Sequence, residues 1–232
     1  MGRIGVSAVV AVLLLVALAV GRAPAVDDAM EASQLVDRAR LTVDAFTADN
    51  NLTAFRDLVK RAKGVFIAPQ VLRGAFIIGA AGGSGVLLAR DDSTGNWGGP
   101  TFHTIGEVSF GLQIGGEASE VILLLMSGRG VSSLLSSSVK LGADATIALG
   151  PVGMGASAAT ANLSADIIAF SRSKGLYAGL SVEGAVVAIR GALNRAYYGQ
   201  DVTPTDVIIR RTVTNPQAAG LIESITKVAS GK

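Results

Sequence analysis

Residues 142–160 read GADATIALGPVGMGASAAT, and residues 164–189 read SADIIAFSRSKGLYAGLSVEGAVVAI. In both segments apolar residues alternate with glycine, alanine and serine, and one cluster of positive charge, Arg172 with Lys174, interrupts the second. Small residues at strand spacing let neighbouring backbones approach closely, although glycine loses more chain entropy on folding than other residues. We therefore predict that residues 142–189 form half of a tightly packed antiparallel sheet whose surface binds a partner.

The composition is that of an apolar, weakly charged globular protein. Of the 232 residues, 50% are hydrophobic and 16% are charged, which excludes a disordered chain. The 29 glycines and 6 prolines follow no collagen period. Because the chain has no cysteine, disulfides, cysteine metal sites, a cysteine nucleophile and a lipid-modified N-terminal cysteine are all excluded.

The first 25 residues have the features of an export signal. Arg3 gives a positive start, residues 4–20 form an apolar run, and Ala23-Pro24-Ala25 fits a small-residue cleavage site. The run is long for a cleaved signal and just short of a comfortable membrane span, so residues 1–25 are a signal peptide or a retained anchor. Both alternatives place residues 26–232 outside the cytoplasm, in the periplasm or the extracellular medium, free or held at a membrane by residues 4–20.

Without this leader the chain is electrically neutral. The whole sequence has 20 Lys and Arg against 18 Asp and Glu, so removing Arg3 and Arg22 leaves 18 charges of each sign. A neutral domain has no general attraction to nucleic acid, and we predict no such partner. Any anionic partner must be bound by a local patch of cations.

Two amphipathic helices are predicted in the N-terminal part. Residues 27–46 place apolar side chains at spacings of three to five and charges on the other face. Thr53 is predicted to cap a second, shorter helix. The cations of this second helix and its end are Arg56, Lys60, Arg61 and Lys63. Such a basic helix can contact a membrane surface or present a solvated face, and the pattern leaves both interpretations open.

A strand region follows the second helix. The turn residues 91–96 predict a hairpin between residues 80–90 and 97–108, and residues 109–126 read as a further strand region.

The C-terminal part returns to helix. Residues 204–211 and 216–228 each follow a capping residue and begin with proline. We therefore predict an α+β fold for residues 26–232 as a single domain. In it, a central antiparallel, glycine-rich sheet or partly closed barrel packs with N-terminal and C-terminal amphipathic helices.

No motif has the spacing of a catalytic or cofactor site. The glycines of residues 79–85 lack the G-x-G-x-x-G and P-loop spacings and instead predict bulges or a bend. His103, the only histidine, has no second ligand for zinc and no G-x-S-x-G serine, so we predict a structural role. Trp97, the only tryptophan, fits either a core edge or an exposed lipid or partner anchor.

We therefore predict no enzyme, no cofactor and no metal. A pair of strand carboxylates doing acid–base chemistry is the remaining catalytic alternative. The acids concerned are Glu107, Glu117, Glu120 and Glu183.

Several short motifs together resemble the SYLF family. In chain order between residues 30 and 211, they include Gly83-Ser-Gly-Val-Leu-Leu, Ser109-Phe-Gly-Leu-Gln, Gly150-Pro-Val-Gly, Ser171-Arg-Ser-Lys-Gly-Leu-Tyr-Ala-Gly and Tyr198-Gly199. Gly98-Gly99 departs from the Ser-Ala that the family often has after the tryptophan, and Tyr177 replaces the usual phenylalanine.

The resemblance implies a lipid-binding domain. Members of the family bind membrane lipids, notably phosphoinositides, yeast relatives also bind actin, and bacterial members are usually exported single-domain proteins. We expect a non-enzymatic protein that binds anionic phospholipid headgroups at the cell envelope. The alternative is a protein-interaction or scaffold module with an envelope protein as partner. The expected headgroup contacts are Arg56, Lys60, Arg61, Lys63, Arg73, Arg172 and Lys174.

Overall fold

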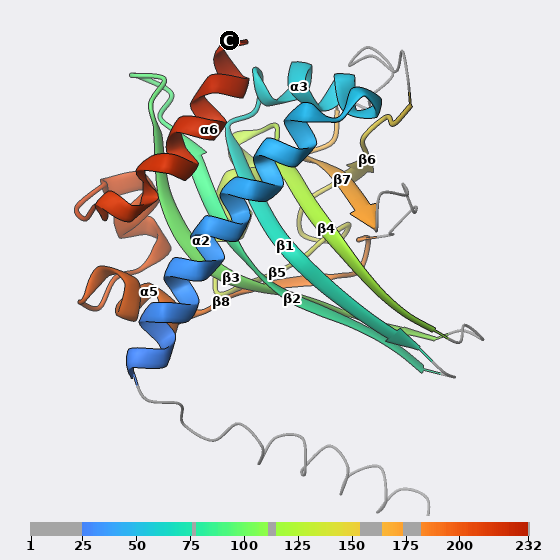
Figure 1. Ribbon diagram of the computed structural model, residues 1–232, viewed down its shortest axis with the longest axis horizontal. Coiled ribbons are helices and arrows are strands. Elements are labelled where there is room, and N and C mark those ends of the chain that lie inside the picture. The colour runs from blue at the N-terminus through green and yellow to red at the C-terminus, as the bar shows by residue number, and fades with distance from the viewer. Residues whose placement is uncertain (1–24, 76–77, 111–114, 154–163, 174–181, 232) are drawn as a thin grey trace, which may run out of the picture.

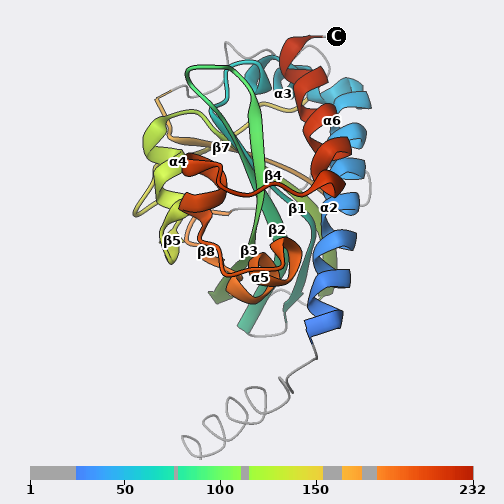
Figure 2. The same cartoon turned by 90° about the vertical axis from the view of Figure 1, so that its left-hand side faces the viewer.

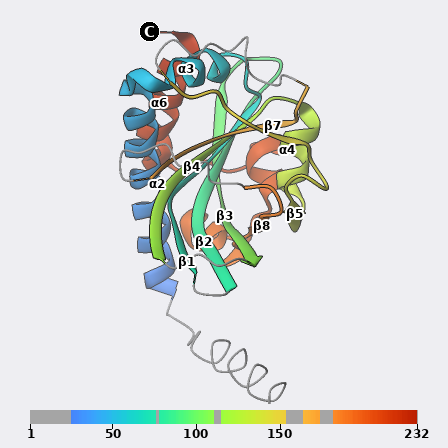
Figure 3. The ribbon, with the colours of Figure 1, turned by 90° about the vertical axis from the view of Figure 1, so that its right-hand side faces the viewer.

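A curled eight-stranded sheet with helices layered on it makes up the centre of the molecule (Figure 1). Figures 2 and 3 show α2 (Ala25–Ala48) and α6 (Ala219–Ser230) side by side on one side of the sheet, with α4 (Gly128–Leu135) on the other. The α+β class predicted from the sequence is confirmed. The computed structural model describes residues 25–75, 78–110, 115–153, 164–173 and 182–231.

The remaining helices and strands follow one another along the chain. They are η1 (Asn50–Leu52), α3 (Thr53–Val59), β1 (Gly64–Ala75), β2 (Ile78–Arg90), β3 (Trp97–Phe110), β4 (Gly115–Leu125), β5 (Ser138–Lys140), β6 (Ile147–Leu149), β7 (Ile167–Ser173), β8 (Val186–Ile189), α5 (Gly191–Tyr198), the π-helix η3 (Asp206–Arg210) and η4 (Pro216–Ala218).

The strands are arranged in the order β5-β8-β3-β2-β1-β4-β7-β6. Neighbouring strands are antiparallel except for β6 and β7, which are parallel. The two edge strands, β5 and β6, are consecutive in the chain, and a bridge between Leu141 and Ala145 joins residues of the short segment between them. The sheet therefore curls into a half-barrel, which is the partly closed alternative predicted from the sequence.

The described strands of residues 142–189 do not form one half of the sheet, contrary to the prediction. β6 and β7 extend the sheet beyond β4, whereas β8 lies on the opposite flank, beside β3. The centre is the four-stranded unit β3-β2-β1-β4, in which β1, β2 and β3 form consecutive hairpins and β4 returns to pair with β1, as in a Greek key. Once these four strands are paired, the later strands can add only at the two free edges. The predicted hairpin is confirmed as β2–β3, and Asp91 accepts hydrogen bonds from the backbone of Ser93 and Thr94, both at 2.8 Å, in its turn.

The two faces of the sheet bury two apolar clusters. On the helix-covered side, the rings of Phe46 and Phe170 both pack edge-on against Phe55, with centroids 5.6 and 5.5 Å away. Inside the half-barrel, Phe66 and other side chains form the second cluster. Trp97 is 6% exposed and belongs to the first cluster, so the structure supports the core alternative for this side chain.

The helix ends confirm two of the predicted caps and correct a third. Asn215 accepts a hydrogen bond from the Gln217 backbone at 3.0 Å, and Thr203 accepts one from the Asp206 backbone at 3.2 Å, as the sequence predicted. The prediction for Thr53 was wrong. Asp49 instead caps η1 by accepting a hydrogen bond from the Asn51 backbone at 2.9 Å, and the chain continues from η1 directly into α3.

None of the helices in the described part of the chain is both long enough and apolar enough to cross a bilayer. Residues 1–24 of the predicted leader, residues 1–25, lie outside the described residues. Whether it is a cleaved signal or a retained anchor therefore stays a prediction.

Candidate functional site

The seven predicted headgroup contacts separate into two groups. Arg56, Arg73 and Arg172 are held by partners inside the protein, at different places. Lys60, Arg61 and Lys63 lie together where α3 leads into β1. The seventh, Lys174, lies outside the described residues.

Arg56 of α3 forms hydrogen bonds to the end of α2. Its Nη1 donates to the carbonyl oxygens of Thr47 and Asp49, both at 2.9 Å. Because the guanidinium satisfies carbonyls at the end of α2, its principal contacts are within the fold.

Arg172 on β7 lies in a polar cluster between the sheet and α2. Its Nε donates to Glu120 at 2.8 Å, and its guanidinium lies 5.3 Å from the centre of the Phe46 ring. Glu120 also accepts a hydrogen bond from Thr42 at 3.1 Å, and Asp49 lies 4.0 Å from the guanidinium. The Arg172 side chain is 21% exposed. Removing one partner of such a partly buried pair leaves the other charge uncompensated, so Arg172 stabilises the contact between β7, β4 and α2.

Arg73 lies inside the half-barrel, near the end of β1 that is remote from Lys63. It pairs with Glu107 at 3.0 Å, with side chains 20% and 16% exposed. The strand register places Glu107, Ala81, Arg73 and Glu117 in one row across four strands. Of the acids considered for acid–base chemistry, Glu107 pairs with the Arg73 guanidinium and Glu117 lies opposite Arg73 on the neighbouring strand.

The second group belongs to a larger cluster of cations at one end of the molecule. Lys60 pairs with Asp57 and Lys63 with Asp92, both at 2.9 Å, while Arg61 is exposed. Two further cations, Arg90 and Lys227, come from distant parts of the chain. We call the set Lys60, Arg61, Lys63, Arg90 and Lys227 the cationic end.

Contacts between three parts of the chain assemble the cationic end: the connection between α3 and β1, the end of β2, and the end of α6. The Arg90 side chain, at the end of β2, donates to the Lys60 carbonyl at 3.2 Å. A Cβ placed on Gly231, directly after α6, would lie 3.4 Å from Lys60 Cε, which brings the last turn of α6 and its Lys227 to the same end. Within the described residues, no carboxylate lies within 4.0 Å of the charged nitrogens of Arg61, Arg90 or Lys227. Sequence reasoning missed Arg90 and Lys227 because they lie on elements that only the tertiary fold brings together.

A groove of about 250 Å³ opens beside Lys63 and Arg90. Its apolar lining includes Val131 and Leu135 of α4 and Ile208 of η3, and Asp91 and Asp92 line it as well. The groove therefore places apolar surface next to two of the five cations.

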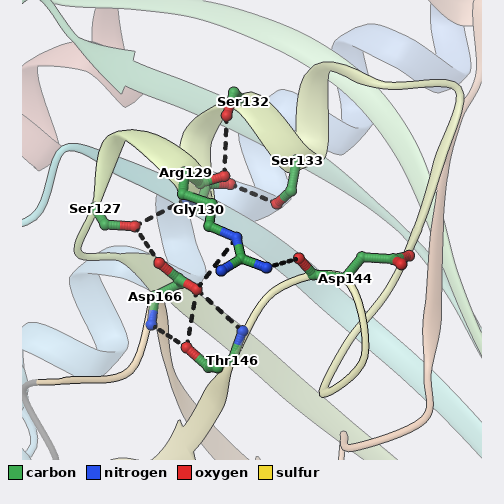
Figure 4. A network of polar contacts seen from close by, with 8 residues as sticks. All are labelled: Ser127, Arg129, Gly130, Ser132, Ser133, Asp144, Thr146 and Asp166. Carbon is green, nitrogen blue, oxygen red and sulfur yellow. Dashed lines mark hydrogen bonds and ion pairs between the residues drawn. The ribbon is translucent and has the colours of Figure 1, made fainter.

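A polar network fixes α4, which forms one wall of this groove (Figure 4). Asp166 accepts hydrogen bonds from Ser127 at 2.5 Å and from Thr146 at 2.9 Å, and Ser127 caps α4 through the Gly130 backbone at 3.0 Å. Arg129 donates to the carbonyl of Asp144 at 3.1 Å. The hydrogen bond from Ser127 is the main cause that lowers the pKa of Asp166, with Thr146 and Arg129 adding to it. Its carboxylate therefore binds the start of α4 to the segment before β6.

His103 is buried away from the cationic end and has a structural environment. Thr101 Oγ1 lies 2.9 Å from its Nε2, the ring packs edge-on against Phe66, and its Nδ1 has no partner. Burial lowers its pKa from 6.5 to about 4. No cluster of three or more potential metal-ligating side chains occurs among the residues that the structure describes.

The stability of the protein should fall between pH 7 and pH 5 because His103 must be neutral to stay buried. A histidine whose folded pKa is lowered contributes stability above its unfolded pKa and loses it as the pH falls toward the folded value. With pKa values of 6.5 and about 4, this loss is about 2 kcal/mol between pH 7 and pH 5. We expect the loss in urea unfolding of the wild type and not of His103→Leu. An equal loss in the leucine variant would show that another group is responsible.

The fold and this site define a half-barrel α+β domain with a cationic surface at one end. The chain belongs to the Ysc84 family: the family model described as "Ysc84: Las17-binding protein actin regulator" matches residues 106–228. The resemblance to the SYLF family, of which this is the defining domain, is thereby confirmed.

Three relatives show the range of the family. The chain is 33% identical to human "SH3 domain-containing YSC84-like protein 1" over 72% of its own length and 48% of the relative. It is 34% identical to "Protein YSC84" of Saccharomyces cerevisiae over 76% and 38%, and 33% identical to "LAS seventeen-binding protein 3" of the same species over 67% and 34%. The chain thus spans about half or less of the length of these relatives. One of these names describes a binding protein, and the family model is described as a binding protein and actin regulator; none of these descriptions names an enzyme.

Proposed function

We propose that this chain is a non-enzymatic binding module that contacts anionic phospholipid membranes through its cationic end. The observation that carries the proposal is the meeting of five cations at one end of the molecule, three from the connection between α3 and β1, one from β2 and one from α6. Three of them, Arg61, Arg90 and Lys227, lie more than 4.0 Å from every described carboxylate. The apolar groove beside Lys63 and Arg90 offers a place for the non-polar part of a lipid. The leader sequence supports a place outside the cytoplasm, at the cell envelope.

The expected strength is that of a reversible membrane contact. Each cation close to an anionic bilayer contributes about 1 kcal/mol. Two of the five cations are already paired with carboxylates, so the net contribution comes mainly from the other three. Because this attraction is electrostatic, salt should weaken it.

Charge reversal at the cationic end should abolish most of the binding. For Arg61→Glu with Lys227→Glu, we expect at least about thirtyfold weaker binding to anionic vesicles, from the loss of about 2 kcal/mol of attraction. Residues 26–232 would be sedimented with vesicles of phosphatidylcholine, with added phosphatidylglycerol or phosphoinositide, at two salt concentrations. Both side chains are exposed, so the fold should be unaffected.

A second double variant controls for net charge. Arg38→Glu with Lys140→Glu makes the same change at exposed positions in the middle of α2 and on β5. It should bind the anionic vesicles like the wild type. Equal losses in both double variants, or no loss in either, would contradict a site at the cationic end.

A protein partner is the second candidate, favoured by the relative named "LAS seventeen-binding protein 3" and by the family model's description as a Las17-binding actin regulator. In that case the apolar groove, rather than the cations, would supply the contact. Binding to vesicles would then be absent, and a partner from the envelope fraction would remain bound at high salt.

A further inference from the structure

The groove beside the cationic end carries charges of both signs. Lys63 and Arg90 line it together with Asp91 and Asp92, and its other lining residues are uncharged, so the formal charges of the lining sum to zero. Arg61, outside the groove, instead has no carboxylate within 4.0 Å in the described part of the chain. The groove and the exposed cations around it are therefore suited to ligands of different net charge.

Arg90 is positioned to bind a phosphate group at the groove. Its Nε donates to the carbonyl oxygen of Gly95 at 3.3 Å, and its Nη1 donates to the carbonyl oxygen of Lys60 at 3.2 Å. A guanidinium has further N–H donors, so these two bonds fix the side chain and leave donors for a ligand. Phosphate oxygens accept strong, charge-assisted hydrogen bonds from such a group. The Arg90 side chain is therefore both held in place and able to bind an anion.

Asp92 is positioned to bind an ammonium group. Lys63 Nζ donates to both of its carboxylate oxygens, at 3.0 and 2.9 Å, and the Asp92 side chain is 75% exposed. An ionised carboxylate has more acceptor positions than these two bonds use, so Asp92 can accept from a second N–H donor. Asp91 accepts hydrogen bonds from the backbone of Ser93 and Thr94 in the turn. It therefore adds negative charge to the groove, while Asp92 offers the free acceptor positions.

The size and the apolar lining of the groove fit a lipid headgroup. Its volume of about 250 Å³ lies below the range of about 300–1,000 Å³ that is usual for pockets that bury a drug-sized ligand. Ile209 of η3 lines the groove and is 59% exposed. A small polar group can therefore enter the groove while the less polar part of the same lipid lies against Ile209.

We infer, resting on the membrane contact proposed above, that the groove binds the headgroup of phosphatidylethanolamine. Arg90, with Lys63 beside it, binds the phosphate, and Asp92 accepts a hydrogen bond from the ammonium. The glycerol end of the headgroup contacts Ile209. This headgroup has one negative and one positive charge and therefore matches a lining whose charges sum to zero.

The same groups discriminate against other headgroups. The ammonium of ethanolamine carries N–H donors for Asp92, whereas the trimethylammonium of choline carries none. Phosphatidylglycerol brings a phosphate without an ammonium, and the carboxylates of Asp91 and Asp92 repel it. Anionic lipids are therefore bound by the exposed cations outside the groove, and phosphatidylethanolamine is bound inside it.

Vesicle binding at constant surface charge tests this inference. Residues 26–232, which contain both buried apolar clusters of the fold, are sedimented with vesicles that contain a fixed fraction of phosphatidylglycerol. The remaining lipid is phosphatidylcholine in one set, and an equal mixture of phosphatidylcholine and phosphatidylethanolamine in the other. Because ion pairs at exposed side chains are weak, we expect the second set to be bound about threefold more tightly.

Two alanine substitutions separate the groove from the rest of the cationic end. Asp92→Ala and Asp57→Ala each remove an exposed carboxylate that pairs with a lysine at 2.9 Å, but of the two only Asp92 lines the groove. Both variants free a lysine, so both should bind the vesicles without phosphatidylethanolamine more tightly than the wild type does. Asp92→Ala should then lose the gain from phosphatidylethanolamine, whereas Asp57→Ala should keep it.

The outcomes distinguish this inference from the proposed function. Binding to phosphatidylglycerol vesicles without any gain from phosphatidylethanolamine would overturn the headgroup site and leave the membrane contact intact. Equal behaviour of the two variants, whether both keep the gain or both lose it, would also overturn the site, because the effect would then come from bilayer packing or from overall charge. The absence of binding to every vesicle composition would overturn both.

Discussion

Replacing Asn194 by leucine is expected to lower the free energy of unfolding by about 3 kcal/mol. Asn194 on α5 is fully buried, and its Oδ1 accepts a hydrogen bond from the Phe102 backbone at 3.0 Å. Its Nδ2 donates to the carbonyl oxygens of Phe102, at 3.4 Å, and Arg190, at 3.3 Å. The side chain thus takes the place of a strand beside β3, because β8 pairs only with residues 103–106.

Leucine has nearly the same volume but leaves the buried Phe102 N–H without an acceptor. An unsatisfied buried donor costs about 1–3 kcal/mol, and the two further hydrogen bonds are lost as well. Urea unfolding of the variant measures the difference. Gln200→Leu makes a comparable amide-to-leucine change at an exposed position just after α5, and should stay within about 0.5 kcal/mol of the wild type. A loss below about 1 kcal/mol for Asn194→Leu would contradict the role assigned to this side chain.

Gly83→Ala should destabilise the sheet by about 3 kcal/mol or more. A Cβ on Gly83 would lie 2.1 Å from the carbonyl oxygen of Gln70 and 3.1 Å from Cα of Val71, both in the backbone of β1. β1 has an irregular register beside these residues. Its pairing with β2 shifts between Ile67 and Gln70, and its pairing with β4 shifts between Ala68 and Val71. Pro69 lies in this bulge, where a proline without an N–H can be accommodated in a central strand.

The neighbouring glycine supplies the control. A Cβ on Gly82 would meet nothing closer than the Ile105 carbonyl oxygen at 3.8 Å. Gly82→Ala should therefore be neutral or stabilise the strand by less than about 1 kcal/mol, because alanine loses less chain entropy than glycine. Thermal unfolding of both variants measures the contrast. Similar melting temperatures for the two would mean that β1 and β2 can separate at the bulge, against the close approach seen in the structure.

Local patterns in the sequence predicted the element types and several of their ends. The turn at Asp91, the caps at Thr203 and Asn215, and the amphipathic period of α2 depend on residues within a few positions of one another. Such short-range chemistry is readable from sequence because the interacting groups are fixed neighbours in the chain. The shared motifs also identified the family correctly.

The position of the strands depended on long-range pairing. The glycine-rich stretch of residues 142–189 predicted strands but not that β7 and β8 would lie on opposite flanks of the sheet. Small apolar residues fit either free edge equally well, so their pattern cannot select one. The choice follows from the central four strands, β3-β2-β1-β4, which leave two edges to be filled.

The sequence by itself determined that this protein is an α+β domain, and only the tertiary structure decided which cations are available. The predicted basic helix was wrong in extent, because α3 ends at Val59 and only Arg56 of its four predicted cations lies in it. Arg172 pairs with Glu120, which is 52 residues away in the sequence, and Arg73 pairs with Glu107, which is 34 residues away. Both partners are too distant in the sequence to be predicted from local patterns. Conversely, only the packing of β2 and α6 brings Arg90 and Lys227 to the end of the molecule where Lys60 and Arg61 lie. The sequence gives the type of each side chain, whereas the tertiary fold determines which side chains lie next to it in space.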